Sequence, residues 1–187
     1  MTSSLPWLDL DYAIDGAGRI VRVGKSWDRV AVENGAPGLV AAHVLDSLLG
    51  EHISDAPSRH LWEVLTDRVR ETGESRTVPI RCDTPALRRW IRVVLIPAEA
   101  GGVIFHTRLE RVEPRPHLAL LDASGPRDPS RLLRLCSWCK RAAVEGRGWL
   151  ELEEAAERLG LLEERPVPEI THGLCEDCEA RMLGRAV

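Results

Sequence analysis

The sequence predicts an α+β fold, an antiparallel sheet with helices on one face, followed by a small carboxy-terminal module built around four cysteines. Two short strand signals open the chain, a block of helical signals follows, and three further strand signals come next as a meander. Early strands that pair with a later meander, with helices packed on one face, form one of the stable layer arrangements of proteins. Two C-x-x-C motifs near the carboxyl end set the second part apart.

Turn and cap residues mark the first elements. Turn residues at 15–18 between β-compatible flanks predict a hairpin over residues 11–22. Residues 26–35 are typical of a short helix with Ser26 as its cap. The apolar stretch 36–53 is interrupted by Gly and Pro, which indicates several short helical pieces rather than one long helix.

The clearest helix signal lies within residues 54–73, where Ser54 or Asp55 can cap the start and Gly73 ends an apolar stripe. The stripe consists of Leu61, Leu65 and Val69. Three segments rich in β-branched and other apolar residues then predict strands. They lie at 76–82, 89–97 and 102–112, with turns at 83–85 and 98–102.

The order of these elements resembles that of a PAS domain. The resemblance covers about residues 8–111 and is carried by "DYAIDGAGRIVRVGKSW", "LLGEHI", "HLWEVLTDRVRETG" and "VPIRCD…LRRWIRVVLIP…GGVIFHTRLE". It implies a sensory domain that encloses a small cavity and that often pairs into a homodimer. Such a cavity is the default site for a small ligand. The side chains expected to line it are Val78, Ile80, Trp90, Ile91, Val93, Leu95 and Phe105.

A haem in this cavity remains an alternative, because three histidines could supply an axial ligand. They are His43, His60 and His106. Cys82 stands apart from the other cysteines. Next to Arg81 its thiol could have a lowered pKa and act as a redox sensor, whereas its alternation with Val78 and Ile80 favours a buried, inert thiol.

Residues 112–130 contain four prolines and several turn residues, which is typical of an interdomain linker. The remaining segment, 131–187, holds both C-x-x-C pairs. About 57 residues are too few to bury a self-sufficient core, so a unit of this size commonly depends on a metal ion. Between the pairs, an acidic stretch predicts a helix with one apolar stripe. The stripe would consist of Trp149, Leu152, Ala156 and Leu159.

The two motifs predict a metal site. The expected ligands are Cys136, Cys139, Cys175 and Cys178, and 35 residues separate the two pairs. Thioredoxin-type redox chemistry needs only one C-x-x-C, whereas four soft sulfur ligands suit tetrahedral Zn²⁺. Cytosolic thiols are kept reduced, which disfavours the alternative of two disulfides.

Zinc is favoured over iron within the metal interpretation. Rubredoxin-like iron sites usually carry small residues just after the cysteines, and Lys140 and Glu179 occupy those places. His172 could replace one thiolate, but four cysteines already complete a shell, so an outer hydrogen-bonding role is expected for it. A closed shell of four protein ligands is structural, because catalysis needs an open coordination position.

The segment 135–182 also resembles a Cys-rich module found at the end of many bacterial signalling proteins built from PAS or receiver domains. "LCSWCK", a Trp-led acidic helix and "THGLCEDC" follow one another in that order. The resemblance implies a signalling context and leaves the activity of the module open.

Net charge, the lengths of the apolar runs and the absence of catalytic motifs argue against several classes of function. The net charge is -4 without a basic block, so no footprint for nucleic acid or anionic lipid is evident. No apolar run approaches the roughly 18 residues of a membrane span, and the acidic amino terminus lacks the positive start of a signal peptide, so a cytoplasmic protein is expected. No nucleophile elbow, P-loop or dinucleotide fingerprint occurs, so an enzyme is not expected.

These observations together predict a cytoplasmic signalling adaptor. Its first domain would bind a ligand or a partner protein, and its zinc module would contact another signalling protein. Two alternatives stay open. One is a zinc-dependent nucleic-acid-binding regulator, in which the locally basic segment "RLLRLCSWCKR" would contact the phosphates. The other is a haem or iron redox sensor, which would be coloured.

Overall fold

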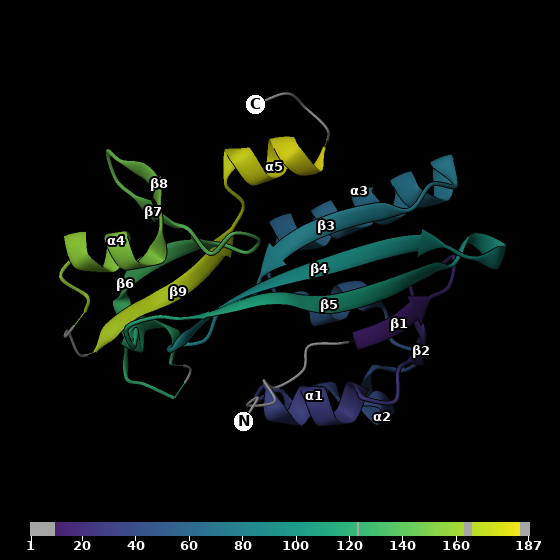
Figure 1. The fold of residues 1–187 in the computed structure, drawn as a ribbon, viewed down its shortest axis with the longest axis horizontal. Helices are drawn as coiled ribbons and strands as arrows, with labels where there is room; N and C mark the ends of the chain where they lie inside the picture. The colour runs from purple at the N-terminus through teal and green to yellow at the C-terminus, as the bar shows by residue number, and fades with distance from the viewer. Residues whose placement is uncertain (1–9, 123, 163–165, 184–187) are drawn as a thin grey trace. The chain divides into compact units, whose positions relative to one another are not determined.

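The computed structural model describes residues 10–122, 124–162 and 166–183, and the chain divides into two compact units (Figure 1). Unit 1 comprises Met1–Pro79 and Ile91–Glu110, and unit 2 comprises Ile80–Trp90 and Arg111–Val187. The chain therefore passes from one unit to the other three times. The hairpin Ile80–Trp90 belongs to unit 2, although the sequence places it within the first domain.

Unit 1 is built on a five-stranded antiparallel sheet with the strand order β2-β1-β5-β4-β3. Its strands are β1 (Leu10–Ile14), β2 (Ile20–Val23), β3 (Arg76–Arg81), β4 (Leu87–Pro97) and β5 (Val103–Pro114). The amino-terminal strand β1 lies between β2 and the central strand β5, and it pairs with β5 in a register that runs from Leu10–Thr107 to Ile14–Val103. Early strands thus close onto the later meander, as predicted.

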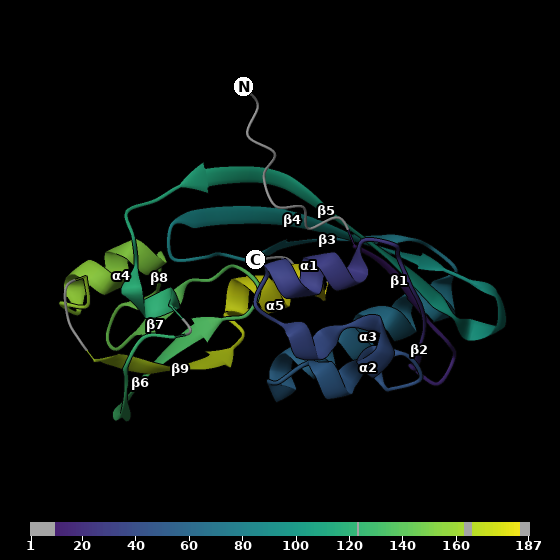
Figure 2. The ribbon, with the colours of Figure 1, turned by 90° about the horizontal axis from the view of Figure 1, so that it is seen from below.

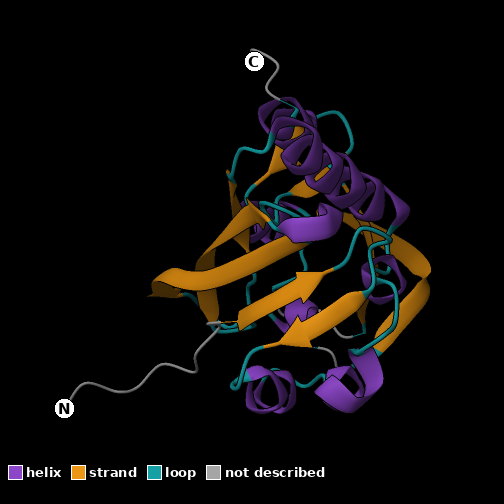
Figure 3. Ribbon diagram, turned by 90° about the vertical axis from the view of Figure 1, so that its right-hand side faces the viewer, coloured by secondary structure: helices purple, strands orange, loops and turns teal. Residues whose placement is uncertain are grey.

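The helices of unit 1 pack on one face of this sheet, as Figures 2 and 3 show. They are α1 (Trp27–Glu33), α2 (Ala41–Val44) and α3 (Ala56–Thr72), together with the 3₁₀ turns η1 (Pro37–Leu39) and η2 (Leu49–His52). The 3₁₀ turn η3 (Glu99–Gly101) instead connects β4 to β5. The α+β class predicted from the sequence is therefore confirmed. None of the described helices combines the length and the apolar character needed to cross a membrane.

Helix α3 shows why these residues form these elements. The carboxylate of Asp55 accepts a hydrogen bond from the amide of Ser58 at 2.9 Å and so caps the helix, while Gly73 ends it at φ 66°. The predicted stripe of Leu61, Leu65 and Val69 is buried. In the same core, the ring of Phe105 stacks on Tyr12 with centroids 4.5 Å apart and meets Trp62 edge-on at 6.0 Å.

Unit 2 contains a second, four-stranded sheet with the order β8-β7-β6-β9. Its strands are β6 (Arg127–Cys136), β7 (Ala142–Val144), β8 (Gly148–Leu150) and β9 (Val167–Gly173), and its helices are α4 (Leu152–Arg158), α5 (Glu176–Met182) and the 3₁₀ turn η4 (Ala119–Leu121). Strands β6 and β9 run parallel, whereas β7 and β8 form an antiparallel hairpin. A continuous apolar core includes Leu120, Leu135 and Leu152.

Two expectations for this region are corrected. The helix between the cysteine pairs does not include all four residues of the predicted apolar stripe. Trp149 lies in β8 instead, and the Arg134 guanidinium lies over its ring, 5.0 Å from the ring centroid. Leu152 and Ala156 are buried in α4 as predicted, but Leu159 follows the helix and is 40% exposed. Glu151, whose backbone is not helical (ψ 144°), caps α4 and separates Trp149 in β8 from the helix.

The predicted linker contains part of the core of unit 2. Within residues 112–130, η4 and the residue before it bury Leu118, Ala119 and Leu120, and β6 begins at Arg127. The prolines of this segment are compatible with a tight turn, since proline restricts φ without preventing compact packing.

Candidate metal centre

The first cysteine pair lies in a tight turn at the end of β6. The amide of Cys136 donates to the carbonyl of Arg141 at 2.8 Å, and the amide of Lys140 donates to the carbonyl of Cys136 at 3.0 Å. Lys140 has φ 62°, a left-handed conformation that usually requires glycine. The turn therefore folds Cys139 back towards Cys136.

The second pair lies where β9 leads into α5. Cys175 is the residue that caps α5, and Cys178 follows in the first helical turn, so one turn of helix places both sulfurs on the same side. Strand β9 is tied to the first pair, because the amide of Ser137 donates to the carbonyl of Gly173 at 2.9 Å. The parallel β6–β9 ladder thus brings together two motifs that are far apart in sequence.

The four sulfurs converge. All four Sγ atoms lie within 4.8 Å of one another, and those of Cys139 and Cys175 are 3.7 Å apart. Tetrahedral zinc with Zn–S bonds of about 2.3 Å requires sulfurs about 3.8 Å apart, whereas a disulfide requires about 2.05 Å. All five cysteines of the chain are free thiols. The geometry fits a metal ion and excludes disulfides within the group.

The protonation of these thiols also fits a cation. Hydrogen bonds from the thiols of Cys139 and Cys178 hold the pKa of Cys136 well below its usual range. Burial raises the pKa of Cys175 to about 11, and the hydrogen bond to Cys136 raises the pKa of Cys178. A thiolate is therefore favoured at Cys136, whereas Cys175 and Cys178 favour their protonated forms. A divalent cation would supply the charge that lets all four sulfurs become thiolates.

Arg141 is a residue of this centre that the sequence motifs do not single out. Its Nε donates to Cys139 Sγ at 3.3 Å, and its Nη2 lies 3.4 Å from Cys175 Sγ. The same Nη2 donates to Asp177 Oδ2 at 2.7 Å. These hydrogen bonds raise the pKa of the guanidinium, that to Cys139 most strongly. The available signal was a pair of basic residues after the first motif, of which Arg141 is the second.

The hairpin Ile80–Trp90 is bound to the same turn. The amide of Arg81 donates to the carbonyl of Trp138, between the two cysteines, at 2.6 Å. The Arg81 guanidinium pairs with Asp83 and, at 2.8 Å, with Glu151. The side chain of Asp83 is fully buried and also pairs with the buried side chain of Arg115 at 2.6 Å. Backbone and charged contacts therefore hold this hairpin within unit 2.

His172 and Cys82 lie outside the sulfur group. His172 is exposed on β9, opposite Leu135 in the register, and is not part of the group of possible ligands found among the described residues. Cys82 is half-buried at the end of β3, where its Sγ accepts a hydrogen bond from Arg89 Nη2 at 3.4 Å. Among the described residues, the group that could hold a metal ion thus consists of the four cysteines of the two motifs.

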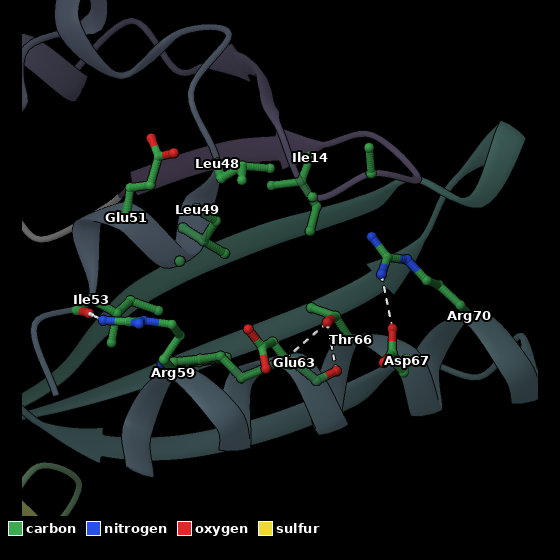
Figure 4. A pocket seen from close by; sticks show the side chains of 14 residues that line it. Ile14, Leu48, Leu49, Glu51, Ile53, Arg59, Glu63, Thr66, Asp67 and Arg70 are labelled. Atoms are coloured by element: carbon green, nitrogen blue, oxygen red, sulfur yellow. Dashed lines mark hydrogen bonds and ion pairs between the residues drawn. The ribbon is translucent and has the colours of Figure 1, made fainter. Parts of the chain in front are cut away.

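Unit 1 has a cavity of about 690 Å³, shown in Figure 4. Its walls come from α3, from the residues around η2 and from the β1–β2 turn. They include Ile14, Leu48, Leu49, Arg59, Trp62, Glu63, Thr66 and Arg70. Across the cavity, the apolar side chains of Leu48 and Leu49 face charged groups on α3 (Figure 4).

The side chains predicted to line a cavity are not among those that line this one. Val78, Ile91, Val93, Leu95 and Phe105 are buried in the core. Ile80 and Trp90 are half-buried and belong to unit 2. In this core, Trp62 of α3 packs edge-on against Phe105 of β5.

The histidines considered for haem do not line this cavity. His43 Nδ1 lies 3.3 Å from the carbonyl of Gly38, and His60 lies 3.9 Å from Glu63 on an exposed stretch of α3. His106 contacts Asp11 at 2.7 Å. Each of these side chains has a protein contact of its own, and they do not converge on one site.

Comparison with known proteins gives a similarity to a solved structure. No protein-family model matches the sequence, and no curated protein matches it. Among solved structures, the chain is similar to the PAS domain of BvgS from Bordetella pertussis, with 22% sequence identity over 55% of this chain and 77% of that chain and a TM-score of 0.43. The PAS-like character of unit 1 rests on its strand order and its one-sided helix layer, and a four-cysteine group that could hold a metal ion marks unit 2.

Proposed function

We propose that this protein is a signalling adaptor in which unit 1 binds a small ligand or a partner protein and a structural zinc ion holds unit 2 as an interaction module. The convergence of four sulfurs within 4.8 Å carries this proposal. Two motifs separated by 35 residues reach one point only because the parallel β6–β9 pair brings them there. A fold organised around that point is consistent with a metal that stabilises it.

The donor set supports zinc and a structural role. Four thiolates are soft ligands, which select zinc, copper(I) or iron–sulfur centres over magnesium or calcium. Four cysteines also complete a tetrahedral shell, so no position is left open for a reacting molecule. The ion would therefore stabilise unit 2, and the surface of that unit would contact the partner.

The cavity of unit 1 is the site we propose for a small ligand. Its volume of about 690 Å³ lies within the usual range of about 300–1,000 Å³ for small-molecule sites. Its apolar side chains would contact the body of a ligand, while Thr66 and the charged groups of α3 would orient it. Native mass spectrometry of the freshly purified chain would show a retained molecule as added mass.

Elemental analysis and a visible spectrum of the freshly purified protein test the metal. We expect about one zinc per chain and no colour. Cys178→Ser removes a ligand and is expected to lose the metal. Cys82→Ser is the matched control and is expected to keep it, because Cys82 lies outside the sulfur group. A metal-free chain, or a coloured chain that contains iron, would contradict the proposal.

A further inference from the structure

Arg141 joins the two cysteine motifs through one guanidinium group. Its Nε and Nη2 lie 3.3 Å and 3.4 Å from the Sγ atoms of Cys139 and Cys175. Cys139 belongs to the first C-x-x-C motif and Cys175 to the second, so the Arg141 guanidinium contacts one sulfur of each motif. The planar guanidinium can reach both sulfurs at once because its N–H groups form a rigid fork.

Asp177 fixes the orientation of that group. Its Oδ2 accepts a hydrogen bond from Arg141 Nη2 at 2.7 Å. Asp177 lies in the first turn of α5, between the two cysteines of the second motif. Metal ligands are commonly oriented by such outer hydrogen-bonding partners, which also adjust the charge on the ligand.

The zinc-loaded site would carry a net negative charge, which the positive charge of Arg141 would partly offset. Four thiolates and one Zn²⁺ carry a net charge of -2, and each thiolate competes with the others for the cation. A guanidinium against two of the sulfurs offsets part of that charge. Lys140 does not fill this role, because its ammonium donates to the carbonyl of Ser137 at 2.8 Å.

We propose that Arg141, oriented by Asp177, is a positioning residue of the metal centre that slows release of the metal by holding one sulfur of each cysteine pair. The inference rests on the proposed zinc site and adds to it a residue outside the ligand shell. It predicts that replacing the Arg141 guanidinium speeds release of the metal, even though all four cysteine ligands remain.

The rate of zinc transfer from the full-length, zinc-loaded chain to a chromophoric chelator tests this role. Arg141→Gln is expected to release zinc about 10-fold faster, which is typical of losing an outer-shell partner. Arg141→Lys is expected to fall between Gln and the parent chain, because an ammonium keeps the charge but loses the fork. Arg147→Gln is the matched control. Arg147 is exposed in the turn between β7 and β8, so its rate should stay within about twofold of the parent.

The contribution of Asp177 is separated by a double-mutant cycle. Asp177→Asn is expected to accelerate release less than Arg141→Gln does. The double variant should release zinc no faster than Arg141→Gln alone, because Asp177 would then have nothing to orient. Timed alkylation followed by mass spectrometry gives a second readout: Cys139 and Cys175 of Arg141→Gln should be modified sooner than in the parent chain.

Each outcome decides a specific point. An unchanged rate in Arg141→Gln, with zinc fully loaded at the start, would overturn the role of Arg141 and leave the zinc site intact. Equal acceleration by Arg147→Gln would overturn it as a general surface-charge effect. Additive effects in the double variant would overturn the role of Asp177. A parent chain that binds no zinc would overturn the proposed function as well, and this result is recognised before any variant is measured.

Discussion

Lys140 holds a backbone conformation that side chains other than glycine rarely adopt. Its φ of 62° lies in the left-handed region, where a β-carbon costs about 1–2 kcal/mol. The hydrogen bond from its ammonium to the carbonyl of Ser137 partly compensates for this strain. The conformation is required because the turn must bring Cys139 back to Cys136.

Lys140→Gly is therefore expected to be more stable than Lys140→Ala by about 1 kcal/mol in urea unfolding of the zinc-loaded chain. Both variants lose the ammonium hydrogen bond, but only glycine relieves the strain. Ser137 is the control, since its φ is not positive. There the order should reverse, with alanine more stable than glycine. A Lys140→Ala variant as stable as Lys140→Gly would show that the turn is not strained.

Asp83 is a buried charge whose partners are also buried. Its carboxylate is fully covered and pairs with Arg81 and with Arg115, whose side chain is covered as well. Removing one member of such a group leaves the others as uncompensated charges in a poorly solvated place. The group therefore contributes stability only as a whole.

We expect Asp83→Asn to lower the free energy of unfolding by about 3–5 kcal/mol. Glu154→Gln is the control, because it removes a charge from the exposed Glu154–Arg158 pair on α4 and should cost less than about 1 kcal/mol. Urea unfolding followed by tryptophan fluorescence compares the two. Similar losses in both variants would mean that burial does not set the importance of Asp83.

The metal ligands could be predicted from sequence, whereas the residue that supports them could not. Two sulfurs in one turn have a fixed spacing, so Cys136 with Cys139 and Cys175 with Cys178 form a recognisable pattern. Arg141 has no such spacing with Asp177, because their contact depends on how β9 leads into α5. A hydrogen bond between a side chain and a distant sulfur leaves no periodic signal.

Local signals determine how well each element is predicted. Helix α3 was predictable because Asp55, an apolar stripe and Gly73 all mark it within one stretch. Strands β7 and β8 have three residues each, too few to show alternation. The parallel partner of β6 follows a helix, so the β6–β9 pairing is a long-range property. The cavity of Figure 4 has a different lining from the one predicted, because side-chain alternation on a strand does not show whether a helix fills the space above it.

Within unit 2, backbone hydrogen bonds join the hairpin Ile80–Trp90 to the cysteine turn and to the segment before η4. The amide of Arg81 donates to the carbonyl of Trp138 in the cysteine turn. On the other side, the amides of Arg115 and Leu118 donate to the carbonyls of Ala86 and Pro85 at 3.0 Å and 2.9 Å. A turn that loses its metal would no longer present the Trp138 carbonyl in this place.

Chelation of the metal is therefore expected to speed hydrogen exchange at the Arg81 amide by more than about 10-fold, because local opening exposes an amide that the folded turn protects. Exchange in the middle of α3, around Leu65, should change little, since that helix belongs to unit 1. Hydrogen exchange with mass spectrometry resolves the two segments. Unchanged exchange at Arg81 after complete removal of the metal would contradict the link.

The two units are interleaved along the chain, which sequence-based domain boundaries could not reveal. The resemblance to a PAS domain places residues 8–111 together, yet Ile80–Trp90 is in unit 2. Residues 8 and 9 lie outside the described part of the chain. Unit membership depends on long-range contacts such as Asp83–Arg115, and neither residue shows this in its local sequence. Prolines in 112–130 mark turns equally well in a linker and in a packed segment.

Interleaved units with separate cores should still respond differently to the loss of the metal. The core of unit 1 contains Leu65, Leu95 and Phe105 and none of the four clustered cysteines. Structural zinc contributes about 10–16 kcal/mol of apparent binding free energy in small zinc-dependent folds. Unit 2 would lose much of this stabilisation on chelation, whereas unit 1 would lose none of it directly.

Differential scanning calorimetry of the full chain is therefore expected to show two transitions, of which a zinc chelator lowers only one. The shift should exceed about 10 °C, because 1 kcal/mol moves the midpoint of a small domain by about 4–8 °C. Added zinc should restore the transition, and added magnesium should not, since sulfur ligands bind magnesium poorly. Cys82→Ser should respond as the parent chain does, while Cys178→Ser should already show the lowered transition without chelator. If both transitions moved together, the metal would stabilise the chain as one cooperative body, and the separate role of unit 2 would have to be abandoned.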